Sequence, residues 1–354
     1  MNFTAKLLSW YSDNKRELPF RGTKDPYLIW LSEIILQQTR VEQGTPYYEK
    51  FVAAYPTVKH LAAADEHSVL KLWQGLGYYS RARNLLSTAR TIANDHDGVF
   101  PGSYADLVKL KGIGDYTAAA IASICFGLPY PVVDGNVLRF FSRHFGITDS
   151  IDHPETKRKI HGLLLDRIDR GNPGDFNQAM MEIGATVCTP ANPKCFQCVF
   201  VKSCIAFKNK TTDKIPARNT KAPVQNRYIH YLVMTVSDQG KEFIFLNKRT
   251  GKDIWENLYD FPSLERPLKK NENQVPEHEF HALINPVVPK FLDVSGQYIH
   301  LLTHQKIHAR FYRFHFEKKT DLPYTLVPLG EISEYPVPKL IERYLSRTIL
   351  KTTY

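Results

Sequence analysis

Two acidic residues occupy positions where a carboxylate could take part in catalysis. Glu33 interrupts the apolar helical segment Tyr27 to Leu36, and such surroundings raise the pKa of a carboxyl group, as a general acid at neutral pH requires. Asp134, in PVVDGNVLR, stands at the start of the helical pattern that follows it, where an aspartate is most often only an N-cap. Capping and catalysis are compatible, because helix N–H groups keep the carboxylate ionised. A protonatable acid with a persistent anion is the arrangement that cleaves glycosidic bonds.

Four of the five cysteines are clustered as Cys188, Cys195, Cys198 and Cys204, with the spacing C-x6-C-x2-C-x5-C. Four thiolates in one loop repel each other unless metal neutralises them, and ligation by cysteine alone favours a [4Fe–4S] cluster. A structural zinc site is the alternative, although zinc ligands usually come as two CxxC pairs and only one is present. Cys125, inside AAAIASICFGLP, is expected to be a small core residue.

A turn containing Gly112 and Gly114 joins two helical patterns in LKGIGDYTA. Glycines let the backbone approach a ligand closely, and the helix that follows presents unpaired N–H groups. A simple turn between two helices is the alternative. In a basic chain we favour contact with the phosphate backbone of DNA.

The elements that must position these residues change character along the chain. Up to residue 208, apolar residues recur at helical spacing, which predicts an all-α domain over 1–208. Residues 209–226 are polar, basic and contain proline, which predicts a linker. The period then becomes two, and Ala309 to Phe316 alternates polar and aromatic residues as half-buried strands do. We expect a mainly β domain over 227–354, with a last helix over 338–348.

Composition limits the classes of protein that the chain can represent. With 354 residues and 43% hydrophobic residues it can build two cores, and its net charge of +10 suits a polyanionic partner. The N-terminal segment is interrupted by charge, unlike a signal peptide, and the longest apolar run, 118–133, is too short to span a membrane. We expect a cytoplasmic protein that does not bind membranes.

Several motifs together make the chain recognisable: LPFR at 18–21, WLSEIILQQTRV at 30–41, QGLGYYSRARNL at 74–85, LKGIGDYTAAAI at 110–121, VDGNVLR at 133–139, and the cysteine spacing. In these the chain resembles the MutY-type adenine DNA glycosylases of the endonuclease III superfamily. That family excises adenine mispaired with 8-oxoguanine. The resemblance implies a base-excision-repair enzyme with an all-α helix-hairpin-helix glycosylase domain and [4Fe–4S] cluster loop, followed by an α+β Nudix (MutT)-like domain.

The resemblance also implies roles in catalysis. Glu33 matches the glutamate that protonates N7 of adenine, Asp134 matches the aspartate that stabilises the cationic sugar, and Asn136 matches a further active-site residue. In the endonuclease III branch, a lysine at the position of Tyr116 attacks the sugar and cleaves the strand. Tyrosine there implies that water is the nucleophile and that the enzyme is a monofunctional glycosylase.

Other matched positions concern recognition of the mispair. Arg21 and Gln178 match residues that contact the flipped adenine, and Gln38 and Tyr78 match residues wedged into the duplex beside 8-oxoguanine. A side chain inserted into the stack fills the gap that the flipped base leaves. The implied partner is double-stranded DNA with adenine opposite 8-oxoguanine or guanine, bound by a monomer and, in a bacterium, at the nucleoid.

The second half resembles the MutT-like domain of the family in RTGKDIWENLYDFPSLE at 249–265. The metal-binding Nudix box, with its R-E-x-x-E-E core, is absent between residues 261 and 301, which implies a reader of the lesion instead of a pyrophosphatase. The lesion-sensing loop of the family, H-x-F-S-H, corresponds to HLLTH at 300–304. The resemblance implies that Thr303 and His304 bind 8-oxoguanine and that Leu302 fills space near the stack.

Three other functions fit parts of the pattern. An endonuclease III-like pyrimidine glycosylase and lyase is opposed by Tyr116 and by the appended domain. A thymine–DNA mismatch glycosylase of the same superfamily can also lack the lysine. A non-catalytic iron–sulfur DNA-binding factor is opposed by the presence of both Glu33 and Asp134.

Overall fold

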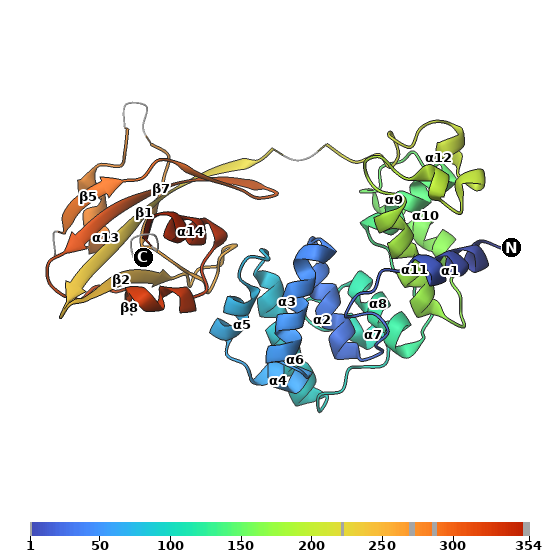
Figure 1. Cartoon of the computed structure of the whole chain (residues 1–354), viewed down its shortest axis with the longest axis horizontal. Helices are drawn as coiled ribbons and strands as arrows, with labels where there is room; N and C mark the ends of the chain where they lie inside the picture. The colour runs from blue at the N-terminus through green and yellow to red at the C-terminus, as the bar shows by residue number, and fades with distance from the viewer. Residues whose placement is uncertain (1, 221–222, 269–272, 285–288, 350–354) are drawn as a thin grey trace. The chain divides into compact units, whose positions relative to one another are not determined.

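The computed structural model describes the chain except residues 1, 221–222, 269–272, 285–288 and 350–354 (Figure 1). It divides into two compact units, one formed by 1–64 with 84–220 and the other by 65–83 with 221–354. The sequence did not indicate that a segment as early as 65–83 packs with the C-terminal half. No helix within the described ranges is long and apolar enough to cross a membrane.

The first unit is built from helices, as the apolar periodicity predicts. Its elements are α1 (Phe3–Asn14), α2 (Pro26–Leu36), α3 (Val41–Ala54), α4 (Val58–Ala63), most of α6 (Ser80–Asp95), α7 (Tyr104–Leu107), α8 (Asp115–Phe126), α9 (Gly135–Phe145), α10 (Pro154–Leu165), α11 (Pro173–Thr186), η1 (Cys195–Gln197), η2 (Val201–Ser203) and α12 (Ile205–Lys208). The expected helical domain is therefore confirmed.

Local sequence explains where the helices that carry the two acids begin. The side chain of Asp25 accepts a hydrogen bond from the N–H of Tyr27, and Pro26 fills the first helical position of α2. Asp134 caps α9 by accepting from the N–H of Val137, as the sequence predicts. Glu33 therefore lies about two turns into α2, whereas Asp134 lies at the start of α9.

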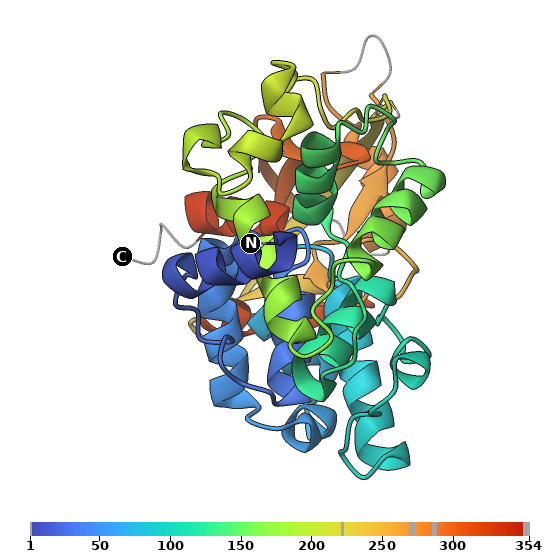
Figure 2. The same ribbon diagram turned by 90° about the vertical axis from the view of Figure 1, so that its right-hand side faces the viewer.

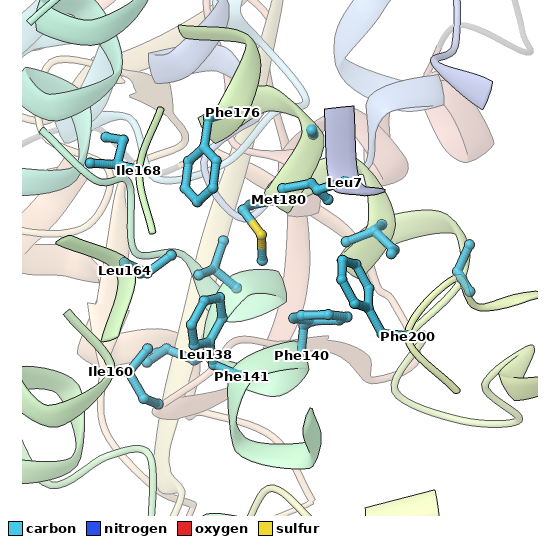
Figure 3. Close-up of a cluster of buried hydrophobic side chains, with 14 of the residues drawn as sticks. Leu7, Leu138, Phe140, Phe141, Ile160, Leu164, Ile168, Phe176, Met180 and Phe200 are labelled. Atoms are coloured by element: carbon cyan, nitrogen blue, oxygen red, sulfur yellow. The ribbon is translucent and has the colours of Figure 1, made fainter. Parts of the chain in front are cut away.

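An apolar core joins the first helix to the later helices of this unit. Leu7 from α1, Phe141 from α9, Ile160 from α10 and Met180 from α11 are fully buried together, with Phe200 from the cysteine loop at the edge (Figure 3). Helix α1 lies against α11 (Figure 2). Burial of each such side chain contributes about 1.5–3 kcal/mol to the stability of the fold. The cysteine loop packs against this core through Phe200.

The second unit is organised by a mixed sheet in the order β3-β2-β1-β7-β5, with β4 on β1, β6 on β7 and β8 on β2. The strands are β1 (Gln225–Asp238), β2 (Lys241–Lys248), β3 (Tyr259–Asp260), β4 (Ser263–Glu265), β5 (Lys290–Val294), β6 (Tyr298–Leu301), β7 (Gln305–Phe316) and β8 (Thr325–Pro328). Strands β1 and β7 pair in parallel, in register from Gln225 with Gln305 to Val236 with Phe316. Buried and half-buried residues largely alternate along β7, as its sequence predicts.

Helices cover and extend this sheet. They are α5 (Glu66–Trp73), η3 (Glu277–Phe280), α13 (His281–Ile284), η4 (Leu329–Glu334), α14 (Lys339–Tyr344) and the π-helical turn η5 (Leu345–Ile349). The segment 65–83 is tied to the C-terminal half by an ion pair between Arg83 and Glu256 and by edge-to-face contacts of His67 with Tyr259 and Tyr335. The mainly β second half and its last helix are therefore confirmed.

Candidate active site

A cavity of 180 Å³ lies in the first unit, among α2, α8, α9, α11 and the loop after α1. It brings together six residues that the sequence places in catalysis or adenine binding: Arg21, Glu33, Tyr116, Asp134, Asn136 and Gln178. These residues come from five separate parts of the chain. Convergence on one cavity is what a shared reaction requires.

Glu33 has the properties of an acid that can hold a proton near neutral pH. The Tyr116 hydroxyl donates a hydrogen bond of 2.5 Å to Oε2 of Glu33. Burial raises the pKa of Glu33 to about 7, although the hydrogen bond from Tyr116 lowers it, and the nearby Asp134 adds to the rise. Burial also raises the pKa of Tyr116 well above 10, so the tyrosine stays protonated and remains a donor.

Asp134 is surrounded by donors that favour its ionised form. Oδ1 accepts from the N–H of Val137 at 2.7 Å, and Oδ2 accepts from Nδ2 of Asn136 at 2.6 Å. Burial raises the pKa of Asp134, and these two hydrogen bonds and the charge of Arg139 oppose that rise. Arg139 also donates to Oδ1 of Asn136 at 2.8 Å and to the carbonyl oxygen of Cys188 at 2.6 Å. The aspartate is therefore held, through two side chains, by the loop that carries the cysteines.

A buried carboxylate that the sequence analysis missed holds the loop carrying Arg21. The side chain of Glu182 is 1% exposed and forms ion pairs with Arg16 and Arg21. Nε of Arg16 donates at 2.7 Å and its backbone N–H at 3.1 Å, both to Oε1. Burial opposes ionisation, but the hydrogen bonds from Arg16 and Arg21 lower the pKa of Glu182. Its spacing of four residues from Gln178 on α11 is the one sequence signal that could have found it.

Gln178 is held in place by a hydrogen bond from α1. The hydroxyl of Tyr11, on α1, donates to Oε1 of Gln178 at 2.8 Å. The guanidinium group of Arg21 lies over the ring of the same tyrosine, 5.6 Å from its centroid. Tyr11 therefore supports both residues expected to contact the base, and nothing in its own sequence context predicted this role.

The two glycines of the hairpin, Gly112 and Gly114, differ in their backbone conformation and in the space around them. Gly112 has φ +79°, and an added Cβ would lie 2.9 Å from Cβ of Asn84, so a side chain is excluded there. Gly114 is the N-cap of α8, has φ −92°, and has open space where a Cβ would lie. Because Gly114 offers no side chain to the first turn of α8, the N–H groups of that turn are available to a phosphate.

The two expected wedge residues both have backbone conformations that are rare for non-glycine residues. Gln38 has φ +55° and Tyr78 has φ +48°. Such strain costs about 1–3 kcal/mol and is concentrated at functional sites. Gln38 belongs to the first unit and Tyr78 to the second.

In the second unit, Tyr78 lies beside the predicted lesion-sensing loop. Its side chain is 49% exposed, and its hydroxyl is 2.7 Å from Oγ1 of Thr303. The loop is a tight turn between β6 and β7, closed by the N–H of Leu302 donating to the carbonyl oxygen of Gln305 at 2.8 Å. Thr303 and His304 form the exposed corner of this turn. Leu302 is half-buried, whereas Leu301 is 70% exposed, which the motif did not indicate.

The four clustered cysteines line one cavity of 20 Å³ with apolar neighbours that include Phe140 and Phe200. None of these four cysteines forms a disulfide, and neither does the half-buried Cys125. Burial raises the pKa of Cys198 to about 11, so bound metal would have to displace its proton. Nη1 of Arg143 lies 3.5 Å from Sγ of Cys188 and places a positive charge beside the thiols.

The spacing of these thiols bears on which metal they could hold. Within the described residues, no three His, Cys, Asp or Glu side chains converge as the ligands of a single ion would. Tetrahedral zinc requires thiolates about 3.8 Å apart, because each Zn–S bond is about 2.3 Å long. A cuboidal cluster keeps its four thiolates farther apart. Four thiols on one cavity are a donor set that could hold a metal group.

Two family models match the chain: an HhH-GPD superfamily base excision DNA repair protein over residues 31–164, and a NUDIX domain over residues 231–347. The adenine DNA glycosylase of Buchnera aphidicola subsp. Schizaphis graminum is 34% identical over 346 residues, which make up 96% of this chain and 98% of that protein. The chain belongs to the adenine DNA glycosylase family. The adenine DNA glycosylase of Homo sapiens is 31% identical over 93% of this chain and 69% of that protein.

A solved structure adds a comparison of the fold. A thermostable thymine-DNA glycosylase superposes with a TM-score of 0.54 and 29% identity, covering 58% of this chain and 95% of that one. The NUDIX match lies in the part that follows the helices. The expected combination of a helix-hairpin-helix glycosylase domain and a Nudix-like domain is therefore confirmed for this adenine DNA glycosylase family member.

Proposed function

We propose that the protein flips adenine out of duplexes in which it is opposite 8-oxoguanine or guanine, and hydrolyses its N-glycosidic bond. The observation that carries this proposal is the pairing of Glu33, with a pKa of about 7, and the hydrogen-bonded Asp134 on one cavity of 180 Å³. One group can donate a proton while the other stays anionic at the same pH.

The proposed reaction assigns a separate task to each group. Glu33 donates its proton to N7 of adenine, so that the electron pair of the breaking C1′–N9 bond can move into the base. Asp134, held by Asn136, stabilises the positive charge that develops on the sugar. Water then attacks C1′ and passes a proton to the carboxylate of Glu33, which restores the acid. Tyr116 positions Glu33 and offers no amine for a Schiff base, so the strand stays intact.

Recognition of the opposite base is assigned to the second unit and to Gln38. Adenine is an undamaged base, so an enzyme that removes it safely must read its partner. Thr303 and His304 can hydrogen-bond to groups that 8-oxoguanine presents and guanine lacks, and the contact between Tyr78 and Thr303 supports a shared role for the wedge and the loop. The missing Nudix box supports a reader without pyrophosphatase activity.

We further propose that Cys188, Cys195, Cys198 and Cys204 hold a [4Fe–4S] cluster. Their convergence on one small cavity beside Arg143 supports it. A bound cluster would make the loop rigid, and Arg139 connects that loop to Asn136. Protein purified without oxygen should contain about four irons per chain. Stoichiometric zinc without iron would show that this assignment is wrong.

The function is tested with duplexes carrying adenine opposite 8-oxoguanine, guanine or cytosine, and with duplexes carrying an oxidised pyrimidine or a G:T mismatch. We expect adenine release from the first two, strands that break only after alkali or heat, and no covalent adduct after borohydride. Glu33→Gln should bind the mispair and release no adenine. Thymine or oxidised-pyrimidine release without adenine release would favour one of the rival glycosylases.

A further inference from the structure

A second cavity, of 760 Å³, adjoins the active-site cavity within the first unit and has no role in the reaction described above. The two cavities share five lining residues: Arg16, Leu18, Arg21, Ile124 and Gln178. We call the second one the rear cavity. Its volume is about four times that of the active-site cavity.

The two cavities are consecutive stretches of one cleft. In α11 and just before it, the lining residues between 171 and 178 belong to the rear cavity, whereas those between 178 and 185 belong to the active-site cavity. Along α8, Tyr116 lines only the active-site cavity, Gly127 only the rear cavity, and Ile124 both. Ile124 and Gln178 therefore mark the junction, with the catalytic carboxylates on one side of it.

The junction is lined by side chains from the loop after α1, from α8 and from α11. Gln178 is held there by the hydroxyl of Tyr11, which lines only the rear cavity. The floor next to the junction is tightly packed, because a Cβ on Gly174 would lie 3.0 Å from Cα of Ile124. A molecule passing between the cavities would have to move side chains that line both of them, Gln178 among these, whereas the backbone of α8 and α11 would stay in place.

The reaction creates a need for such a passage. The flipped nucleotide enters the active-site cavity from the DNA, and after hydrolysis the abasic sugar still lies next to Asp134 while the duplex is bound. The detached base then lies between the sugar and the junction. We propose that free adenine leaves through the rear cavity before the enzyme releases the abasic DNA, an inference that rests on the function proposed above.

The lining of the rear cavity suits transit and not storage. Part of its lining consists of exposed charged side chains, namely Lys15, Glu17, Lys24 and Asp175. Adenine has amino donors and ring-nitrogen acceptors, so it can exchange hydrogen bonds with water and with these side chains as it moves.

The test narrows the rear cavity without touching the active site. Ser12 is an exposed residue of α1 that lines the rear cavity, and its neighbour Asp13 is exposed and does not line it. Ser12→Trp adds an indole to the passage, and Asp13→Trp adds the same group outside it. Full-length proteins are mixed with a duplex carrying radiolabelled adenine opposite 8-oxoguanine. Bond cleavage is followed by alkaline quenching, and free base is followed by rapid filtration that retains the protein–DNA complex.

With the unmodified protein, free base should appear before the abasic duplex dissociates. Ser12→Trp should slow the appearance of free base about tenfold, as expected when product release becomes limiting, and leave the cleavage rate unchanged. Asp13→Trp should match the unmodified protein. Base release that coincides with duplex dissociation, or an unchanged release rate in Ser12→Trp, would overturn the inference. Failure of the proposed function is distinguishable, because then the quenched samples would contain no cleaved adenine.

Discussion

At the scale of single residues, the proton on Glu33 sets the pH dependence. Burial raises the pKa of this carboxyl group to about 7, and a general acid is active only while protonated. Single-turnover adenine release should therefore fall as the pH rises through about 7. A rate that increases with pH across this range would contradict the assigned role.

The hydrogen bond from Tyr116 provides a directional test of that assignment. It lowers the pKa of Glu33 against the effect of burial, so its removal should raise this pKa further. Tyr116→Phe should therefore move the alkaline limb of the pH–rate profile to higher pH. The same profile measured with Tyr104→Phe, whose hydroxyl donates to Asp115 instead, is the control. A limb that moves to lower pH in Tyr116→Phe would exclude Glu33 as the group that titrates.

Glu182 is expected to matter through two arginines and not through contact with the reacting bond. Removing one partner of a buried ion pair leaves uncompensated charge, at a cost of about 3 kcal/mol. Glu182→Ala should lower the free energy of unfolding by about this amount, measured by urea denaturation. Glu17→Ala, at an exposed position beside the same loop, should leave it nearly unchanged. Equal stabilities for the two variants would show that the ion pairs contribute little.

At the scale of elements, the sequence predicted the helices and the helix cap, because these depend on residues that are close together in the chain. Apolar periodicity located the helices that carry Glu33 and Gln178, and the residues around Asp134 predicted its cap, because these features involve neighbours within one or two turns. The ion pairs of Glu182 with Arg16 and Arg21 join residues more than 150 positions apart. Such contacts depend on how helices pack, which a single sequence does not reveal.

In the hairpin, the backbone conformation and close packing require glycine at Gly112, whereas Gly114 has room for a side chain. Gly112→Ala introduces a Cβ against Asn84 at a positive φ, and should destabilise the protein by about 1–2 kcal/mol. Gly114→Ala enters open space at a negative φ and should cost less. Thermal unfolding of both variants measures the difference. If Gly114→Ala were the more damaging change, the hairpin geometry described above would not hold in solution.

At the scale of the whole molecule, the sequence predicted two domains, but it did not predict that a segment of the helical half packs with the C-terminal half. The segment 65–83 lies among helical motifs, yet its contacts place it with the C-terminal half. Tyr78 and Thr303 are separated by 225 positions, so no local pattern could have paired them. Deleting the C-terminal half would therefore remove the residues against which α5 and the loop after it pack. Discrimination between mispairs is therefore best tested in the full chain.

The exposed corner formed by Thr303 and His304, with Tyr78 beside it, is expected to set the discrimination between mispairs. Losing one specific contact to a base costs about 1–3 kcal/mol, or roughly 5- to 150-fold in preference. His304→Ala should therefore narrow the ratio of adenine release rates between 8-oxoguanine and guanine duplexes, with the chemistry at Glu33 retained. Tyr78→Phe and Thr303→Ala should each narrow it as well, and together less than additively, because their hydroxyl groups form one hydrogen bond. Single-turnover release on the two duplexes gives the ratio. If it were unchanged in all of these variants, Gln38, in the first unit, would be left as the residue that reads the opposite base, and the β-rich half would need another role.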